Sequence, residues 1–323
     1  MIKVGLIGCG FMGTMHANCY KSIEGVKLAA VADLRKEKAE ALADGAEIFE
    51  DGMELIEKAD VDVIDICLPT YLHAEYAVSA MKKVGYVFVE KPVALTCREA
   101  DMMLEAAKET GCNVQVGQVI RFWDEYVELR KIIESGVYGR VVNANFRRIS
   151  PVPTWGWNNW LRDVSLSGGA AQDLHIHDTD YVLSLFGEPD TFHSVKNTIG
   201  EANSYICTVM KYKDFAVSVE GTWDLPESHP FEATFRVVFE KATVENAGGK
   251  FMCYTPEGAT EIRLEKKELS GGYKGGNIDD LGGYYNELLY FTDAAKSGSK
   301  PQMATLADAA KSLEFVLREI EKA

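Results

Sequence analysis

The feature that most constrains this 323-residue chain is a glycine pattern close to its start. Residues 8–13 read GCGFMG, which follows the short apolar run 2–7 and opens a helical stretch over 11–22. Asp33 lies twenty residues after Gly13, at the end of a second apolar run over 26–33. A GxGxxG turn between a strand and a helix, with an acidic residue at the end of the next strand, predicts a βαβ unit that binds a dinucleotide.

Each position of this fingerprint has a physical reason. Gly8 permits the tight turn, Gly10 lets the backbone approach a pyrophosphate, and Gly13 lets the helix pack closely on the strand. Phe11 and Met12 begin the helix, whose N terminus stabilises the phosphate charge. The alternative is a glycine-rich turn without a ligand, and the presence of the strand, the helix and the acidic residue together argues against it.

The acidic residue also bears on the choice of cofactor. The carboxylate of Asp33 can accept hydrogen bonds from the ribose hydroxyls of the adenosine, and it would repel a 2′-phosphate, so NAD is favoured over NADP. Arg35 weakens this preference, because its guanidinium could stack on the adenine or tolerate a phosphate. A solvated arginine at a helix start is the alternative for Arg35.

Strand and helix patterns alternate as far as about residue 120. Short apolar runs separated by helical stretches are typical of a parallel sheet that is covered on both faces. Residues 1–120 are therefore predicted to form a Rossmann domain, a doubly wound parallel sheet, in an α/β protein. The expected strands are 2–7, 26–33, 61–68, 86–90 and 112–117, and the expected helices are 11–22, 35–43, 53–58, 72–83 and 96–110.

A different pattern follows this region. Alternating apolar residues in longer segments predict a mostly antiparallel sheet with one packed face. Residues 121–323 are therefore predicted to form an α+β domain that contains this sheet, with a boundary near residue 120. Residues 270–283 are too rich in glycine for regular structure. The expected strands are 140–150, 191–198, 204–212, 215–223 and 231–240, and the expected helices are 122–135, 284–297 and 304–321.

Composition excludes several classes of partner. The formal net charge of −15 argues against binding to nucleic acid and to an anionic membrane surface, both of which need a basic footprint. The seven cysteines are widely spaced and include no CxxC pair, which predicts reduced thiols rather than a disulfide framework or a zinc ribbon. The chain shows no signal-peptide pattern and no apolar run long enough to span a membrane, so we expect a cytoplasmic protein.

Two further motifs follow the expected strands 61–68 and 86–90. Ligands of open α/β sheets bind beyond the carboxyl ends of the strands, so both motifs are candidates for the cofactor site. The lysine of the motif Glu90-Lys91-Pro92 can bind a ligand oxygen or the cofactor ribose. For His73, a capping or packing role is the more common alternative. The candidate cofactor contacts in these loops are Pro69, Thr70, His73, Glu90 and Lys91.

Residues 168–180 read GGAAQDLHIHDTD and raise the question of a second site. Asp173 and His177 are four residues apart, so a helix would place them on one face. A carboxylate orients a neighbouring imidazole and makes it a better base, which alcohol oxidation needs. His175 is two residues from His177 and would point elsewhere, so a shared metal ion is disfavoured and none is expected. For His175, a buried hydrogen-bonded role and a substrate contact both stay open.

These motifs together resemble the glucose–fructose oxidoreductase and inositol dehydrogenase family, known as Gfo/Idh/MocA. The resemblance rests on GCGFMG, Asp33, the LPTYLHAE loop, EKP at 90–92, VGQVIRFWDEY at 116–126 and DLHIHDTD at 173–180. It extends over nearly the whole chain, and the order of glycines and histidines looks closest to the inositol dehydrogenase branch. Members join a Rossmann domain to an open, mostly antiparallel sheet, and they oxidise or reduce a carbinol of a sugar or cyclitol.

The resemblance implies roles for particular residues. Lys91 would bind the reacting oxygen, Asp173 would orient His177, and His177 would act as the general acid and base. NAD would be the cofactor, with NADP less favoured, and a sugar or polyol the substrate. The open sheet would join copies into a homodimer or homotetramer. Further candidate substrate contacts are Arg121, Tyr126 and Trp160, with Trp155, Trp157 and Arg162 nearby.

A second kind of function stays open. Some proteins of this fold bind a nucleotide and a partner without catalysis, and such a nucleotide-sensing binding protein is the alternative to an NAD-dependent dehydrogenase. The retention of both Lys91 and His177 favours the enzyme. The sequence names neither the sugar or cyclitol nor the physiological direction of the reaction.

Overall fold

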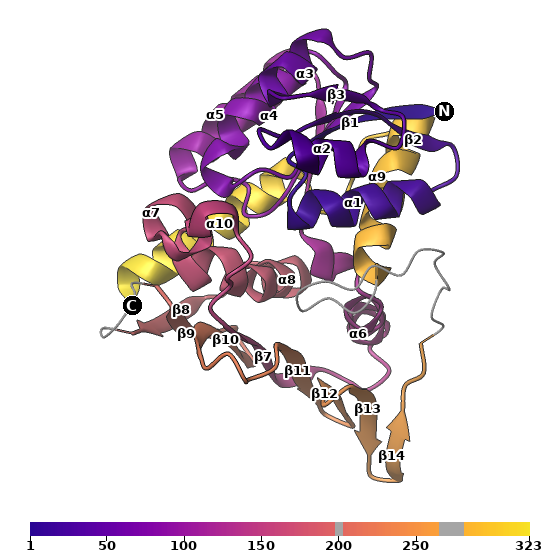
Figure 1. The fold of residues 1–323 in the computed structure, drawn as a ribbon. Coiled ribbons are helices and arrows are strands. Elements are labelled where there is room, and N and C mark those ends of the chain that lie inside the picture. Colours follow the sequence, from indigo (N-terminus) through magenta and orange to yellow (C-terminus); the bar gives the residue numbers. More distant parts are fainter. Residues whose placement is uncertain (198–202, 265–280) are drawn as a thin grey trace. The chain divides into compact units, whose positions relative to one another are not determined.

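The computed structural model describes residues 1–197, 203–264 and 281–323, and its internal contacts divide them into two units (Figure 1). Unit 1 contains Met1–Val119, Trp155–Trp160 and residues 281–313. Unit 2 contains Ile120–Thr154, residues 161–264 and residues 314–323. The first boundary between the units therefore falls after Val119. Two later segments, Trp155–Trp160 and residues 281–313, also belong to unit 1.

Unit 1 is built on a parallel sheet of six strands in the order β3-β2-β1-β4-β5-β6. This order is that of the Rossmann fold, in which the sheet is extended first to one side of β1 and then to the other. Buried Val, Ile and Leu side chains fill the strands because helices cover both faces. The strands are β1 Ile2–Ile7, β2 Val26–Ala32, β3 Glu47–Phe49, β4 Val63–Ile66, β5 Tyr86–Val89 and β6 Asn113–Val116.

Helix α5 of unit 1 begins and ends at residues suited to these positions. In α5 the Thr96 side chain and Glu99 form a capping box, and Gly111 ends the helix in a left-handed conformation. Helix α9 packs beside α1 on one face of the sheet, while α3, α4 and α5 follow one another on the other (Figure 1). The helices are α1 Phe11–Ser22, α2 Lys36–Ala43, α3 Gly52–Lys58, the 3₁₀ turn Thr70–Leu72, α4 His73–Met81, α5 Cys97–Thr110 and α9 Gly282–Ser297.

Unit 2 is built on an eight-stranded sheet in the order β14-β13-β12-β11-β7-β10-β9-β8. All neighbouring strands are antiparallel except β7 and β10, which run parallel. The predicted fold class is therefore confirmed, and the sheet extends beyond the last predicted strand. The strands are β7 Val141–Pro151, β8 Thr191–Lys196, β9 Tyr205–Lys211, β10 Ala216–Leu225, β11 Glu232–Phe239, β12 Thr243–Ala247, β13 Lys250–Thr255 and β14 Gly258–Glu261.

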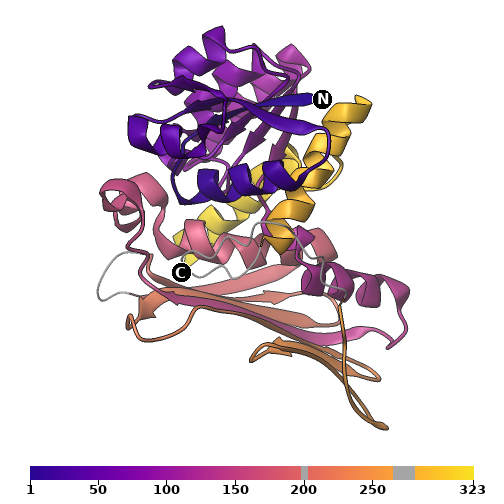
Figure 2. The ribbon, with the colours of Figure 1, turned by 45° about the vertical axis from the view of Figure 1, so that its right-hand side comes forward.

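Helices cover one face of this sheet (Figures 1 and 2). Alternating residues of β9 and β10 are buried on that face, whereas Val195 of β8 and Val209 of β9 are 47% and 48% exposed. The sheet is thus open on its other face, within the part of the chain that the structure describes. The helices are the 3₁₀ turn Val119–Phe122, α6 Asp124–Ser135, α7 Val164–Ser167, the π-helical turn Ala171–His175 and α8 Ile176–Phe186, with the 3₁₀ segment Trp157–Arg162 and α10 Leu306–Lys322 divided between the units.

Two sequence expectations bear on the chain as a whole. All seven cysteines are free thiols: Cys9, Cys19, Cys112 and Cys253 are buried, Cys67 and Cys207 are half-buried, and Cys97 is exposed. Among the helices that the structure describes, none has the length and apolar character needed to cross a membrane. Most of the glycine-rich stretch 270–283, up to residue 280, lies outside the described residues.

Candidate active site

The fingerprint turn has a geometry that only glycine permits at two positions. Gly8 adopts a φ of +93°, and a Cβ there would lie 2.5 Å from the Cys67 carbonyl oxygen. A Cβ on Gly13 would lie 1.8 Å from the carbonyl oxygen of Gly8. Because glycine has no Cβ, α1 can lie this close to the end of β1. At Gly10, the residue before Phe11, a Cβ would meet only Arg35, at 3.9 Å. The N terminus of α1 is therefore open to a phosphate at Gly10.

Asp33 closes the other end of this site. Its Oδ2 accepts a hydrogen bond from the backbone N–H of Cys9 at 2.8 Å, and its Oδ1 accepts one from the backbone N–H of Arg35 at 2.9 Å. The Arg35 guanidinium also binds both oxygens, at 3.0 and 3.1 Å. Burial alone would raise the pKa of Asp33, but these hydrogen bonds hold it below its usual value. The carboxylate is thus charged and fixed beside the fingerprint turn.

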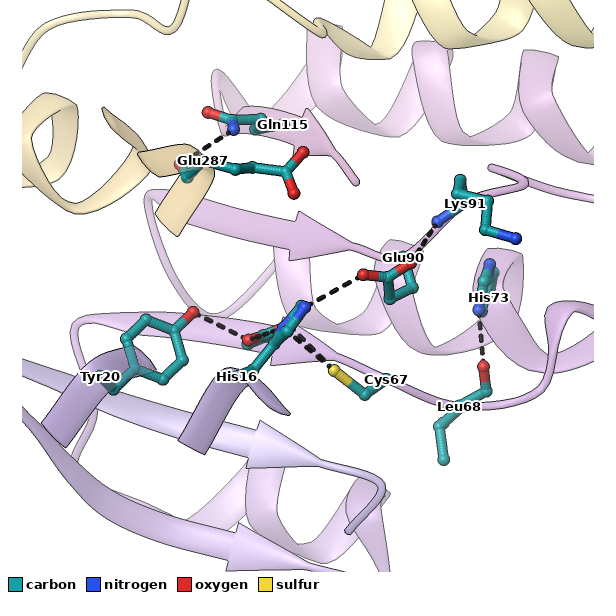
Figure 3. A network of polar contacts seen from close by, with 10 residues as sticks. His16, Tyr20, Cys67, Leu68, His73, Glu90, Lys91, Gln115 and Glu287 are labelled. Atoms are coloured by element: carbon teal, nitrogen blue, oxygen red, sulfur yellow. Dashed lines mark hydrogen bonds and ion pairs between the residues drawn. The ribbon is translucent and has the colours of Figure 1, made fainter. Parts of the chain in front are cut away.

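His73 joins the loops that follow β4 and β5. Its Nε2 lies 2.8 Å from the carbonyl oxygen of Leu68 (Figure 3), and its Nδ1 lies 2.8 Å from that of Pro92. Burial lowers the pKa of His73, although both carbonyl groups oppose this shift. The ring is 1% exposed and Thr70 is 2% exposed, so both side chains shape the loops from inside. This is the packing alternative that the sequence left open for His73, and Pro69 lies at the start of the same turn.

The Glu90-Lys91-Pro92 motif lies at the carboxyl end of β5, with a cis peptide bond between Lys91 and Pro92. The Glu90 carboxylate accepts a hydrogen bond from the Lys91 backbone N–H at 3.1 Å. Its other oxygen lies 3.0 Å from Nε2 of His16, which projects from α1. Glu90 therefore fixes the backbone of Lys91 and connects it to the buried interior of unit 1 (Figure 3).

Behind Glu90 lies a buried polar cluster that the sequence analysis missed. Nδ1 of His16 lies 2.8 Å from Oδ2 of Asp65, and the Tyr20 hydroxyl donates to the same oxygen at 2.8 Å. Burial alone would lower the pKa of His16, but Asp65 and Cys67 raise it well above its usual value. A charged imidazole between two carboxylates is consistent with these contacts. The only sequence signal was an aspartate inside the apolar run VDVIDICL.

His16, Asp65 and Cys67 are also a group of possible metal ligands. Their ligand atoms lie within 4.8 Å of one another. Two ligands of one zinc ion are about 3.3 Å apart, given metal bonds of about 2.0–2.1 Å and tetrahedral angles. The 2.8 Å between His16 and Asp65 is instead a hydrogen-bond distance, and Tyr20 shares the same carboxylate oxygen. We interpret the group as a hydrogen-bonded cluster.

In unit 2, the DxxxH stretch does not form one regular helix. Residues Ala171–His175 form a π-helical turn that leads directly into α8 at Ile176. Asp173 lies in the π turn and is partly buried, whereas His177 lies in the first turn of α8 and is 8% exposed. Single π-helical turns within helices occur frequently at functional sites. Both candidate residues therefore lie where the helix geometry changes.

The neighbouring polar residues are held inside unit 2. His175 is fully buried, and its Nε2 lies 3.2 Å from both carboxylate oxygens of Glu319 in α10. Of the two roles that the sequence left open for His175, this contact supports the buried, hydrogen-bonded one. Asp178 and Asp180 are also fully buried, paired with Arg148 at 2.8 Å and with Arg121 at 2.7 Å.

Three residues were predicted to contact the substrate, and their surroundings differ: Arg121, Tyr126 and Trp160. The Arg121 guanidinium binds both oxygens of Asp180. Tyr126 is fully buried, and its hydroxyl accepts a hydrogen bond from Arg148 at 3.1 Å. Both residues thus hold α8 in place. Trp160 is partly buried, in the 3₁₀ segment Trp157–Arg162, and groups with unit 1.

The fold and the fingerprint define a class of protein. The glycine turn, Asp33, the His73 loop and the EKP motif all lie at the carboxyl ends of neighbouring parallel strands, which is where Rossmann enzymes hold NAD. Residues 2–118 match the sequence model of an oxidoreductase family described as an NAD-binding Rossmann fold, and residues 126–245 match the Gfo/Idh/MocA C-terminal domain. The chain belongs to the Gfo/Idh/MocA oxidoreductase family, as its motifs predict.

Similar proteins agree with this assignment. The chain is 30% identical over 231 residues to myo-inositol 2-dehydrogenase of Thermotoga maritima, covering 68% of this chain and 67% of the relative. It is 27% identical over 331 residues to scyllo-inositol 2-dehydrogenase (NAD(+)) of Bacillus subtilis, covering 97% and 91%. An Agrobacterium radiobacter oxidoreductase solved with NAD+, L-tartaric acid and magnesium shares the fold, with a TM-score of 0.84, 19% identity and coverage of 100% and 96%. The chain is thus an oxidoreductase with an NAD-binding Rossmann domain, and its relatives include inositol 2-dehydrogenases.

Proposed function

We propose that this enzyme transfers a hydride between C4 of the nicotinamide of NAD and a secondary carbinol carbon of a cyclitol of the inositol class. The observation that carries the proposal is the retention of both Lys91 and the Asp173–His177 pair in a chain whose relatives are named inositol 2-dehydrogenases. In oxidation, the carbinol C–H bond breaks and its electron pair moves with the hydrogen to nicotinamide. The hydroxyl proton goes to a base, and a ketone remains.

In this proposal each residue has one role. His177 accepts the hydroxyl proton in oxidation and returns it in reduction, and Asp173 orients the imidazole and binds a substrate hydroxyl. Lys91 donates a hydrogen bond to the reacting oxygen, and the contact between its backbone N–H and Glu90 supports this position. Trp160 is a proposed contact for the apolar face of the ring. Arg121 and Tyr126 act indirectly, because their contacts with Asp180 and Arg148 hold α8.

We also propose that the enzyme prefers NAD to NADP. Asp33 is held in its charged form, and a carboxylate at this position accepts hydrogen bonds from both ribose hydroxyls. A 2′-phosphate would instead meet this charge. Arg35 offsets part of the repulsion because it already binds both oxygens of Asp33.

The test is the formation of NADH, followed by its near-ultraviolet absorbance, with a panel of inositols, aldoses and sugar nucleotides, and with NADP in parallel. Lys91→Met and His177→Asn should each lower kcat at least about 100-fold, the usual contribution of positioned acid–base groups. Lys82→Met is the matched control, since Lys82 is an exposed lysine of the same unit. NADH binding without turnover of any compound would reject the proposal and favour a nucleotide-sensing protein.

The open sheet of unit 2 supports a proposal about assembly. Val195, Val209 and Tyr254 are 47%, 48% and 41% exposed on strands β8, β9 and β13. Exposed apolar side chains on a regular sheet are typical of a surface that pairs with another protein. We propose that two copies associate through this face as a homodimer or within a homotetramer. Sedimentation should show an oligomer that Val209→Lys dissociates, and a monomeric wild-type protein would reject the idea.

A further inference from the structure

The segment Trp155–Trp160 groups with unit 1, although the residues on either side of it belong to unit 2. Two of its side chains are large, apolar and open to solvent: Trp155 is 47% exposed and Trp157 is 39% exposed. Exposed tryptophans are uncommon and often mark a binding surface. The sequence left open whether they stack on a sugar or pack in the core, and this exposure does not fit a core role.

Each of these tryptophans contacts one end of the dinucleotide fingerprint. The ring of Trp155 lies 4.8 Å from that of Phe11, centre to centre, and Phe11 is the first residue of α1 at the phosphate turn. The ring of Trp157 lies 5.9 Å from the Arg35 guanidinium carbon, which is within the range of a cation–π contact. Arg35 in turn binds Asp33, the expected ribose acceptor.

The backbone directly after Trp157 has an unusual conformation. Asn158 and Asn159 adopt left-handed conformations, with φ of 51° and 54°. Asparagine adopts this conformation more readily than other residues with a side chain, yet two in succession are rare. Leu34, between Asp33 and Arg35, adds a side chain that is 72% exposed. Exposed apolar side chains therefore lie beside Arg35 in the sequence, at Leu34, and against its guanidinium, at Trp157.

We propose that the tryptophan segment is part of the NAD site, with Trp157 and Arg35 forming a wall for the adenine and Trp155 covering the pyrophosphate turn beside Phe11. Adenine is a flat π-system, and an arginine backed by an indole ring presents it with a flat, polarisable surface. A ring at the phosphate turn excludes water and so strengthens the interaction of the phosphates with the N terminus of α1. This inference rests on NAD binding and not on the proposed reaction.

The test is isothermal titration calorimetry of the full-length protein, without substrate, using NADH, ADP-ribose and AMP. Stacking of a base on an aromatic ring contributes about 1–3 kcal/mol, so Trp157→Leu should weaken all three ligands about 5- to 150-fold. Trp155→Leu should weaken NADH and ADP-ribose but leave AMP within about twofold, because AMP does not span the pyrophosphate turn. Trp157→Phe, which keeps an aromatic ring, should recover most of the lost affinity.

Met102→Ala is the matched control, because Met102 is an equally exposed apolar residue on α5 of the same unit. It should bind all three ligands like the wild type. Thermal melting of each variant shows whether it is folded. If folded Trp155→Leu and Trp157→Leu bind NADH within twofold of the wild type, the proposal is wrong. The same result with a raised substrate KM would assign the tryptophans to the sugar instead.

Discussion

Gly10, which caps the N terminus of α1, and Gly13, in its first turn, should respond differently to substitution by alanine. A Cβ on Gly13 would lie 1.8 Å from the Gly8 carbonyl oxygen, whereas real Cβ contacts exceed 3.0 Å. The helix would have to move from the strand by at least about 1.2 Å, the difference between these distances. At Gly10 the nearest atom is a terminal nitrogen of Arg35 at 3.9 Å, and φ is −77°, so alanine fits.

The magnitudes follow from these distances. Overpacking costs about 1–3 kcal/mol, so Gly13→Ala should lower the Tm by roughly 2–12 °C for a unit of this size. Gly10→Ala should cost less than about 1 kcal/mol as an N-cap change. However, its methyl group would keep the pyrophosphate from the backbone N–H groups. Hydrogen bonds to a charged group contribute about 1.5–3 kcal/mol, so NADH should bind roughly 10- to 150-fold more weakly.

Thermal melting and calorimetric titration with NADH separate the two effects. Gly85→Ala is the control, since a Cβ there would meet nothing within 4 Å. It should change neither Tm nor Kd by much. A Gly10→Ala protein that binds NADH normally would show that the cofactor does not approach this turn. A Gly13→Ala protein with the wild-type Tm would refute the steric account of how α1 packs on β1.

Three further predictions follow from buried or exposed groups. Arg148→Met leaves the fully buried Asp178 without its cation and should cost about 3–5 kcal/mol in urea unfolding, while adding Asp178→Leu should recover part of this loss. Since the folded pKa of His16 is raised, its contribution to stability is full below about pH 6.5 and is lost as the pH rises through the raised value. Unfolding free energies at pH 6 and pH 9 should therefore differ less in His16→Gln than in the wild type, and equal differences would contradict this. Cys97 is the one exposed cysteine, so a thiol reagent should modify a single thiol rapidly. Cys97→Ser should remove that fast phase.

The fold was predictable from the sequence because its local and tertiary signals agree. In unit 1, the buried strands are mostly apolar, side chains cap α3 and α5, and the glycines fall where the turn needs them. The short strand β3 was missed because only three residues, Glu47–Phe49, form it, and two of them are exposed. In the same way, β14 was missed because all four of its residues are exposed.

The candidate site was predictable only where its motifs are local. GCGFMG, Asp33 and Glu90-Lys91-Pro92 each sit at a strand end that the apolar pattern marks. The His16–Asp65–Glu90 chain was not predictable, because its three members come from α1, β4 and the end of β5. Their pairing depends on strand order, and no periodicity in the sequence reports it. The same reason hid the contact between Trp157 and Arg35, which are more than a hundred residues apart.

The π-helical turn at Ala171–His175 shows why the DxxxH spacing is less informative than it looks. An α-helix turns by 100° per residue, so residues four apart share a face, whereas a π turn adds one residue to the cycle. Asp173 lies in the π turn and His177 in α8, so their relation is set by where the extra residue falls. The buried contact between His175 and Glu319 fixes that point, since rotating the turn would break it. His175, whose role the sequence left open, thereby fixes the position of His177, the proposed base.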